Sequence, residues 1–391
     1  MYRTFRAALL CGTIILAGCT LRLGDSFAEA VGKGVTDHID PVRQIRQVAD
    51  RVLTDFPEPP PFDWGEGVLM AGMIQAGLAT DEPRYVAFVQ RWADHWRDKG
   101  LAPILAGAPQ GEERGYCGHW GPGFPVVMLY EETKDPSYLA TARQIAEFIE
   151  TKATRTPDGG LGHWAGNYQL WADTLYMVCP LMASLGRIES RPAYTREAVR
   201  QLEIFTRHCR DNKTGLFYHM YDQPTAKRVG VLWGRGNGWV VMSYVEVLRN
   251  LDRTSPEFAR LSADFQRLVR ALLAVQDKDT GLWHTVLDRP DSYIETSASA
   301  MILYGFAEGT RLGLVDGVDR EEAAAWFGLC SKANDGGHVI DVSGGTSPAA
   351  YEAYANKVRG TESWGTGAFL LAASAVKTQW ASGRTRTNRA R

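Results

Sequence analysis

Asp173 is the carboxylate in this sequence whose surroundings could support acid–base chemistry. It stands in the run Trp-Ala-Asp-Thr-Leu-Tyr-Met at residues 171–177, among aromatic residues and at the expected start of a helix. Partial burial by the aromatic rings would raise its pKa, whereas the positive end of a helix would lower it. Such a group could donate a proton and later take one back from water. The residues alone leave open a second interpretation, in which Asp173 simply caps the helix.

Arg235 is the cation best placed to bind an anionic ligand. It lies in the run Trp-Gly-Arg-Gly-Asn-Gly-Trp at residues 233–239, where the flanking glycines would let a ligand approach the backbone. A guanidinium can bind a carboxylate through two parallel hydrogen bonds. The run lacks the spacing of a dinucleotide-binding loop, and no strand–helix–strand pattern surrounds it. The alternative is that Arg235 only bridges two loops.

Histidines, tryptophans and a second acid complete the set of candidates. His163, His219 and His284 each lie within three residues of a Gly-Leu pair and could donate hydrogen bonds to sugar hydroxyls, although a single histidine is more often structural. Glu295 could be a second acid or a charge that complements a helix end. Indole rings stack on sugar faces and also fill cores. The candidate rings are Trp120, Trp164, Trp171, Trp233 and Trp239.

A six-fold repeat indicates which elements position these side chains. Segments rich in Gly and Ala recur at 63–70, 119–126, 171–177, 233–239, 294–301 and 363–370. Segments with amphipathic helical periodicity alternate with them, at 41–56, 85–96, 138–149, 194–209, 258–275 and 319–332. Helices that are apolar all round are buried. The pattern predicts an all-α fold, an (α/α)6 toroid with short β excursions in its loops; an open helical solenoid is the alternative.

Such a ring would gather the candidate residues at one mouth. Consecutive inner helices run in the same direction, so their N-termini, with free N–H groups, open on one face. The long loops that carry the histidines feed that same face. We therefore expect a cleft there that favours an anionic ligand. The ring would form a single catalytic domain at residues 40–376.

The first 19 residues have the features of an export signal. Two arginines precede an apolar run, and Leu16-Ala17-Gly18-Cys19 resembles a bacterial lipobox. We expect Cys19 to be lipidated, which would anchor the protein at the periplasmic face of the cell envelope and limit membrane contact to the lipid. A later cut near Ala28, giving a soluble periplasmic protein, is the alternative. Residues 20–39 would be a linker, and the basic tail at 377–391 a disordered end.

Composition narrows the classes of partner and cofactor. The 391 residues include 43 Lys plus Arg and 45 Asp plus Glu, for a net charge of −2, so no bulk basic field for nucleic acid exists. Four cysteines beyond the export signal are widely spaced, and we expect buried free thiols: Cys117, Cys179, Cys209 and Cys330. No spacing of Cys and His suggests a metal, and we expect neither a metal nor a cofactor.

Several of these runs together resemble family 105 of the glycoside hydrolases, the unsaturated rhamnogalacturonyl hydrolases, and the related unsaturated glucuronyl hydrolases of family 88. The runs are 160–163, 171–177, 215–219, 233–239 and 295–301, in family order along residues 40–375. The resemblance implies an enzyme that removes a 4,5-unsaturated uronic acid from the non-reducing end of lyase-generated oligosaccharides. It would do so by hydrating the C4=C5 double bond, without a metal or a covalent intermediate.

The resemblance also implies roles for single residues. Asp173 would protonate C4 and activate the water that adds at C5, and Arg235 would hold the uronate carboxylate. By motif, the residues that match pocket positions of the family are His163, Trp171, His219, Trp233 and Trp239. Trp164, Asn237 and Glu295 are further candidates for substrate binding. The family's usual second Asp, at the start of the second inner helix, is absent. That place reads Cys-Gly-His-Trp at 117–120, where His119 could serve instead.

Two other functions stay open from the sequence. One is an (α/α)6 enzyme that acts on a saturated uronide with Asp173 and Glu295 as an acid/base pair. The other is a glycan-binding lipoprotein without catalytic activity, built on the same ring.

Overall fold

Two sets of alternating helices build the molecule. The computed structural model describes residues 38–107 and 115–389, so Cys19 and the rest of the predicted export signal and linker up to residue 37 lie outside the described residues. Within the described residues, the inner set comprises α5 (Trp64–Thr80), α8 (Gly123–Thr133), α10 (Ala172–Ile188), α12 (Gly234–Arg249), α14 (Thr296–Arg311) and α17 (Ser363–Arg389). The outer set comprises α4 (Pro41–Asp55), α6 (Pro83–Lys99), α9 (Pro136–Lys152), α11 (Pro192–Cys209), α13 (Pro256–Ala274) and α15 (Asp319–Cys330).

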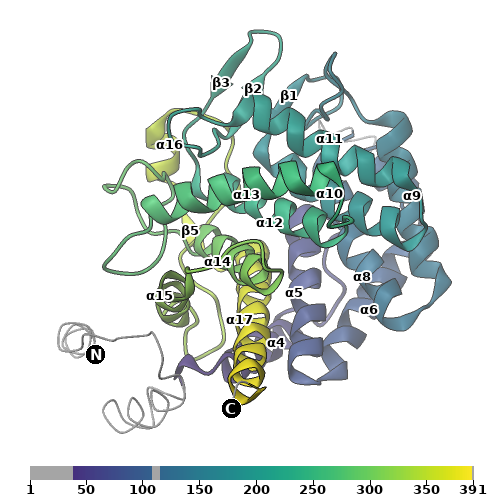
Figure 1. Ribbon diagram of the computed structural model, residues 1–391. Coiled ribbons are helices and arrows are strands. Elements are labelled where there is room, and N and C mark those ends of the chain that lie inside the picture. Colours follow the sequence, from purple (N-terminus) through teal and green to yellow (C-terminus); the bar gives the residue numbers. More distant parts are fainter. Residues whose placement is uncertain (1–37, 108–114, 390–391) are drawn as a thin grey trace, which may run out of the picture.

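The inner helices are closed into a ring, as predicted. The last of them, α17, packs along the first, α5, which lies about 300 residues earlier in the sequence and beside it in Figure 1. The two backbones meet at glycines: a Cβ added at Gly72 would lie 2.6 Å from the carbonyl oxygen of Gly367. No larger side chain fits at this crossing, so closure depends on glycine. The (α/α)6 toroid is confirmed, and the open solenoid is wrong.

The outer helices begin where the sequence places them. Five of the six described outer helices have proline in the first turn, which supplies a fixed φ and needs no intrahelical partner. Asp135 and Ser255 cap their helices by accepting hydrogen bonds from Ser137 N (2.9 Å) and Phe258 N (3.1 Å). Each of these helices then turns its apolar side toward the inner ring, as α6 does with Tyr85 and Trp92.

Short strands lie in the loops at one edge of the ring. An antiparallel sheet is formed by β1 (Gln169–Trp171), β2 (Met220–Asp222) and β3 (Lys227–Val229). The chain passes directly from β1 into α10. β4 (Val342–Ser343) pairs with β5 (Arg359–Gly360), and the short helix α16 (Tyr351–Ala355) lies between them in the chain and near β2 and β3 in Figure 1. The predicted β excursions are therefore present. Two further short helices, α7 (Ala102–Leu105) and η1 (Cys117–Trp120), precede α8.

The C-terminal segment differs from the expected disordered tail. α17 continues through residues 377–389 and ends at Arg389. Extending an existing helix needs no new nucleus, and this stretch contains no proline and one glycine. The prediction of a disordered end rests on the basic charge of the segment and does not take this propagation into account. Among the described residues, no helix is both long enough and apolar enough to cross a bilayer.

Candidate active site

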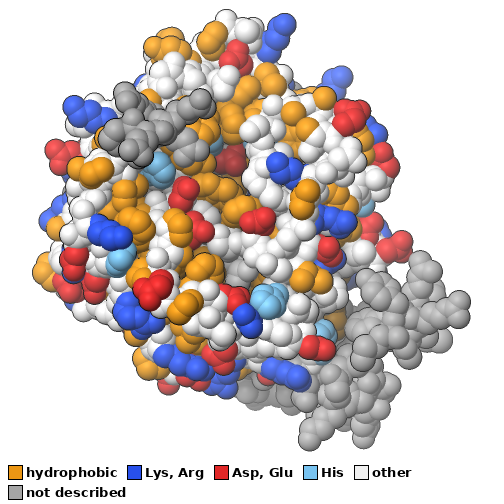
Figure 2. Space-filling view, turned by 180° about the vertical axis from the view of Figure 1, so that it is seen from behind, with side chains coloured by type: hydrophobic (Ala, Val, Ile, Leu, Met, Phe, Trp, Pro, Cys, Tyr) orange, Lys and Arg blue, Asp and Glu red, His pale blue; other side chains and the backbone are white. Residues whose placement is uncertain are grey.

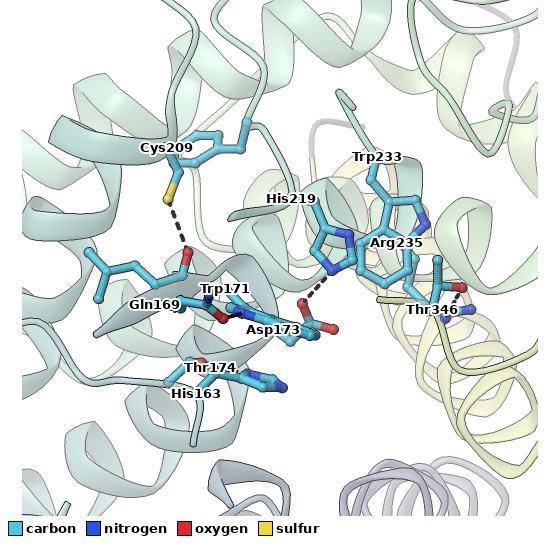
Figure 3. Close-up of polar contacts among 12 residues, drawn as sticks. His163, Gln169, Trp171, Asp173, Thr174, Cys209, His219, Trp233, Arg235 and Thr346 are labelled. Atoms are coloured by element: carbon cyan, nitrogen blue, oxygen red, sulfur yellow. Dashed lines mark hydrogen bonds and ion pairs between the residues drawn. The ribbon is translucent and has the colours of Figure 1, made fainter. Parts of the chain in front are cut away.

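Asp173 lies in the first turn of α10, directly after β1, and its carboxylate faces His219 (Figure 3). Asp173 Oδ2 is 3.4 Å from His219 Nε2, an ion-pair distance longer than an ordinary charge-assisted hydrogen bond. Neither atom has a closer hydrogen-bond partner among the described residues. The Asp173 side chain keeps 18% of its surface exposed, whereas that of His219 is fully enclosed. The carboxylate is thus buried yet open to a ligand.

The neighbours of Asp173 favour its ionised form. Burial alone would raise the pKa of Asp173, but His219, His163 and Arg235 act in the opposite direction and hold the pKa below its ordinary value. The free protein therefore presents a carboxylate. Because it does not accept the capping hydrogen bond that a plain N-cap residue makes, the simple capping interpretation does not fit.

His163 is held on the other side of Asp173 by a buried polar cluster. Its Nδ1 lies 3.0 Å from Thr174 Oγ1 and 3.2 Å from Cys117 Sγ. Its ring stacks on Trp171 with centroids 4.0 Å apart and planes within 9°. Burial lowers the pKa of His163 to about 3, although Asp173 opposes the shift, so the ring is neutral at ordinary pH. Sequence reasoning missed Thr174 and Cys117 as its partners.

Arg235 is tied to the last residue of β4 and to the loop that follows it. Its guanidinium donates to Ser343 O (2.7 Å), Ser343 Oγ (2.6 Å), Gly344 O (3.0 Å) and Thr346 Oγ1 (3.4 Å), and it lies 4.6 Å above the Trp233 ring. The residue thus bridges loops, which was the alternative considered from the sequence. It still places a positive charge within electrostatic reach of Asp173. Its role in binding a substrate carboxylate stays a prediction.

Glu295 is a buried helix cap. It is fully buried, and its two oxygens accept hydrogen bonds from Ser297 N (3.1 Å), Ala298 N (2.7 Å), Ser343 N (3.0 Å) and the Ser297 hydroxyl. These donors occupy the carboxylate from several sides, so no oxygen is left for a substrate. The geometry does not fit the predicted substrate contact or a second catalytic acid. It confirms the helix-end alternative.

Asn237 also has a structural position. Its amide is fully buried; it accepts from Phe217 N (2.8 Å) and donates to Phe217 O and Trp233 O (both 2.9 Å). It therefore fixes the strand-like segment that leads to His219, and does not itself reach a ligand. A polar residue in a Gly-rich run looked like a binding residue, but every buried amide needs such partners.

The tryptophans divide into core rings and cleft rings. Trp120, Trp233 and Trp239 are at most 1% exposed, which places them in the core or beneath other site residues; the Trp233 ring lies under His219, with centroids 4.0 Å apart. Trp164 and Trp171 are half-buried, and Trp164 stacks on Tyr116 at 4.2 Å. Only the second group presents ring surface to a sugar. Seen from the side opposite to Figure 1, the surface is hollowed, and hydrophobic and acidic side chains line the hollow (Figure 2).

Where the family usually has a second Asp, this chain has a thiol and an imidazole, from Cys117 and His119. Cys117 is a buried thiol, and burial raises its pKa well above the ordinary value. His119 is half-buried with an unpaired Nδ1. Asp63, the cap of α5, lies close enough for His119 to influence it: burial raises the pKa of Asp63, and Trp64 N and His119 oppose this. Sequence reasoning missed Asp63, although it opens the first copy of the repeat.

The remaining predicted features lie away from this centre. His284 is bound to Ser292 O (2.6 Å) and has a structural role. The four cysteines of the described chain are free and buried, as predicted. Within the described residues, no cluster of three or more His, Cys, Asp or Glu side chains has the arrangement of a metal site.

Comparisons with known proteins agree with the resemblance predicted from the motifs. The chain is 32% identical over 312 residues to the unsaturated rhamnogalacturonyl hydrolase YesR of Bacillus subtilis, covering 78% of this chain and 86% of that protein. It is 26% identical over 341 residues to an unsaturated 3S-rhamnoglycuronyl hydrolase of Formosa agariphila, covering 81% and 84%.

The fold and the family pattern point the same way. A crystal structure described as a possible member of the GH105 family from Klebsiella pneumoniae matches with a TM-score of 0.74 at 25% identity, covering 82% of this chain and 83% of that chain. The sequence pattern of Glycosyl Hydrolase Family 88 matches residues 39–379, from the start of α4 into α17. Since that match spans the whole helical ring, the chain belongs to glycosyl hydrolase family 88 and is a glycoside hydrolase.

Proposed function

We propose that the protein removes a 4,5-unsaturated uronic acid from the non-reducing end of lyase-generated oligosaccharides by hydrating the C4=C5 bond. The observation that carries this proposal is Asp173, a buried but ligand-accessible carboxylate whose predicted partner acid, Glu295, is fully occupied as a helix cap. Ordinary glycosidases need two carboxyl groups on opposite sides of the scissile bond. Hydration of a double bond needs only one group that first gives and then takes a proton.

The reaction balances with Asp173 as the only acid and base. Protonated Asp173 donates its proton to C4, and positive charge develops at C5, where the ring oxygen stabilises it. The Asp173 carboxylate then takes a proton from water while the water oxygen bonds to C5. The resulting hemiketal opens to a ketone, and the hemiacetal left at C1 collapses to an aldehyde and releases the neighbouring sugar as an alcohol. One water is consumed, and Asp173 ends protonated as it began.

Binding of the substrate would itself favour the protonated form of Asp173, which the proton transfer to C4 requires. In the free protein His219, His163 and Arg235 keep the pKa of Asp173 low despite burial. A uronate carboxylate brought near Asp173, together with the exclusion of water, disfavours a second negative charge and raises that pKa. Asp173 would then take up its proton as the substrate binds. Arg235, held by the β4 loop, would act as a fixed positive charge that attracts the uronate.

The relatives suggest the leaving sugars to test first. Their names specify unsaturated rhamnogalacturonyl and 3S-rhamnoglycuronyl substrates. We propose an uronyl–rhamnose linkage for this protein as well, with the half-buried rings of Trp164 and Trp171 against the sugars. His119 would replace the family's second Asp near the substrate, which favours an anionic or sulfated sugar over a neutral one.

The test is the loss of the ultraviolet absorbance of the double bond in lyase digests. Wild-type protein should abolish the absorbance of at least one digest, and Asp173→Asn should not, with its folding retained. Asp135→Asn is the matched control, because Asp135 caps the outer helix α9 and makes the same kind of change far from the site. If absorbance persists while saturated uronic acid is released, an ordinary uronidase is the better assignment. If wild-type protein binds the oligosaccharides without changing any digest, and Asp173→Asn binds them equally well, a glycan-binding protein is the better assignment.

We also propose that Cys19 carries a lipid that anchors the enzyme in the bacterial envelope, facing the periplasm. The support is the lipobox-like run at residues 16–19 after an apolar segment. Mass spectrometry of the mature N-terminus in a bacterial host should find a diacylglyceryl cysteine at position 19, and Cys19→Ala should release the protein from the membrane fraction. An unmodified N-terminus beyond residue 19 would show a soluble periplasmic protein instead.

A further inference from the structure

One distant segment contacts two of the polar neighbours of Asp173, Arg235 and His219. The chain from β4 to α16, residues 342–355, receives the guanidinium of Arg235 through Ser343, Gly344 and Thr346. The same segment places Tyr354, whose hydroxyl oxygen lies 2.6 Å from His219 Nδ1. Tyr354 stands 135 residues after His219 and is fully buried.

The backbone nearby is shaped to admit the tyrosine. Gly230 has φ of +86°, and a Cβ added there would lie 2.7 Å from the Tyr354 hydroxyl and 3.0 Å from His219 Cβ. A larger residue would press on both side chains, and its backbone conformation would be strained. Glycine at this position therefore makes the contact between Tyr354 and His219 possible.

The hydrogens of this contact can be assigned by counting donors and acceptors. The Tyr354 oxygen accepts from Ala349 N at 3.4 Å, so its single proton is free to point at His219. Burial raises the pKa of Tyr354, which therefore stays a phenol, and burial lowers the pKa of His219, which is therefore neutral. A neutral imidazole that accepts at Nδ1 carries its hydrogen at Nε2. That hydrogen points at Asp173 Oδ2, 3.4 Å away.

The opposite tautomer would be unfavourable. With the hydrogen on Nδ1, the lone pair of His219 Nε2 would face the Asp173 carboxylate, and the tyrosine proton would lose its acceptor. Both groups are buried, so water could not replace the missing contacts. We propose that Tyr354 is a positioning residue that locks His219 as the Nε2–H tautomer, so that an N–H group always faces Asp173.

This proposal rests on the proposed function and explains one half of the reaction. After Asp173 has protonated C4, it must remain a carboxylate long enough to take a proton from water. A fixed N–H donor stabilises that carboxylate without itself carrying a charge. His219, His163 and Arg235 act on the pKa of Asp173, and the Asp173 charge in turn raises the pKa of Cys117 and of Tyr354. Among them His219 is the one in ion-pair contact, so its tautomer has the most direct effect.

The first test needs no variant. In wild-type protein labelled at histidine, the ring nitrogen chemical shifts of His219 should report a neutral ring with hydrogen on Nε2. In Tyr354→Phe the shifts should indicate a mixture of both tautomers. A wild-type His219 with its hydrogen on Nδ1 would overturn the proposal, whether or not any substrate has been found.

The second test uses kinetics on a digest that wild-type protein turns over. Tyr354→Phe should lower kcat about 10- to 100-fold with little change in KM, the range for outer partners that orient a histidine. Because Asp173 loses its fixed donor, its pKa should rise, and the fall of kcat at high pH should move to higher pH. Tyr244→Phe is the matched control: its hydroxyl is equally buried, 2.7 Å from Thr206 Oγ1, but belongs to the core.

A double variant separates positioning from a general structural role. In a His219→Phe background, Tyr354→Phe should cause no further loss of kcat and no further shift, because the tyrosine acts only through the histidine. Additive losses, or a Tyr354→Phe profile like that of wild type, would contradict the proposal while leaving the proposed hydrolase activity intact. Failure of wild-type protein on every digest would instead count against the activity.

Discussion

The two ends of the inner ring use the same residue types in opposite ways. At the N-terminal end, Asp173 and Arg235 are buried without a direct contact between their charges: the arginine is bound to neutral oxygens and the carboxylate faces a neutral histidine. At the C-terminal end, Arg249 pairs with Glu246 at 3.2 Å and with Glu308 at 2.7 Å. The N-terminal end leaves its carboxylate open to a ligand, and the C-terminal end uses its charges in ion pairs.

The C-terminal end surrounds a small cavity. It has a volume of about 220 Å³, and residues from all six inner helices line it, including Glu246, Arg249 and Tyr304. Tyr304 donates a hydrogen bond to Glu246, and Arg311 pairs with Glu308 at 2.7 Å. Burial raises the pKa of Glu246 even though Arg249 and Tyr304 oppose it, whereas the neighbours of Asp173 prevail over burial. The contrast indicates a structural network at one end and a reactive carboxylate at the other.

Exchanging a carboxylate for an amide at each end should break this comparison most sharply. Asp173→Asn should lower kcat by about 1,000-fold or more, in the range of general acid–base catalysis, because the amide can neither give nor take the proton. Glu246→Gln should leave kcat per folded molecule within about twofold. Initial rates on a lyase digest, normalised to folded protein, measure both. Equal losses from the two variants would mean that the ends are not functionally distinct.

For stability we expect the opposite order: a variant at the C-terminal end should lose more unfolding free energy than a variant at the N-terminal end. Arg249→Met removes the cation between two buried carboxylates, and breaking such a buried pair costs about 3–5 kcal/mol of unfolding free energy. Asp173→Asn should cost far less, since its nearest charged or polar contact is a 3.4 Å one. Denaturant unfolding monitored by tryptophan fluorescence measures both. The triple variant, with Glu246 and Glu308 both changed to Gln in the Arg249→Met background, should recover part of the loss. No recovery would argue that packing, not charge, is responsible.

The ring was predictable from local patterns, because the residue types along a single helix indicate whether it is buried on all sides or on one side only. The runs rich in Gly and Ala correctly predicted inner helices such as α12, and prolines at helix starts correctly predicted outer helices such as α11. Asp173, His163 and His219 were recognised from runs of a few residues each. Helix burial, helix starts and short motifs all depend on residues that lie close together in the sequence.

The parts that were missed or misassigned depend on contacts between distant segments. The contacts that hold Arg235 could not be predicted from its own run, because its partners Ser343 and Thr346 come from more than 100 residues later. Tyr354 carries no local motif, and only the closed ring brings it to His219. Glu295 was ambiguous, because an acid at a helix start has the same sequence whether it caps the helix or meets a substrate. The three-dimensional count of its donors resolved that choice.

Acid should lower the unfolding free energy of the protein through His163, which is buried at the N-terminal end of the inner ring. Burial takes the pKa of His163 from 6.5 to about 3, so between these values the unfolded chain binds a proton that the folded chain does not. Stability is therefore full above pH 6.5 and falls as the pH drops toward 3, by at most about 1.4 kcal/mol per pH unit for this one group. His163→Gln should flatten the slope of unfolding free energy against pH in this window. An unchanged slope would show that His163 does not titrate this way.

The smallest effect should come from the cleft rings, and it separates them from the core rings. Trp164→Ala removes a half-buried ring that stacks on Tyr116, so KM should rise roughly 2- to 10-fold, the equivalent of one aromatic contact, with kcat and stability nearly unchanged. Trp120→Ala is the matched truncation of a fully buried ring, and it should cost about 3–5 kcal/mol of stability without a change in KM. Steady-state kinetics at several oligosaccharide lengths would locate the contact. A rise in KM only for longer oligosaccharides would place Trp164 beyond the released uronic acid, against the leaving sugar, whereas an equal rise for disaccharides would place it at the site of cleavage.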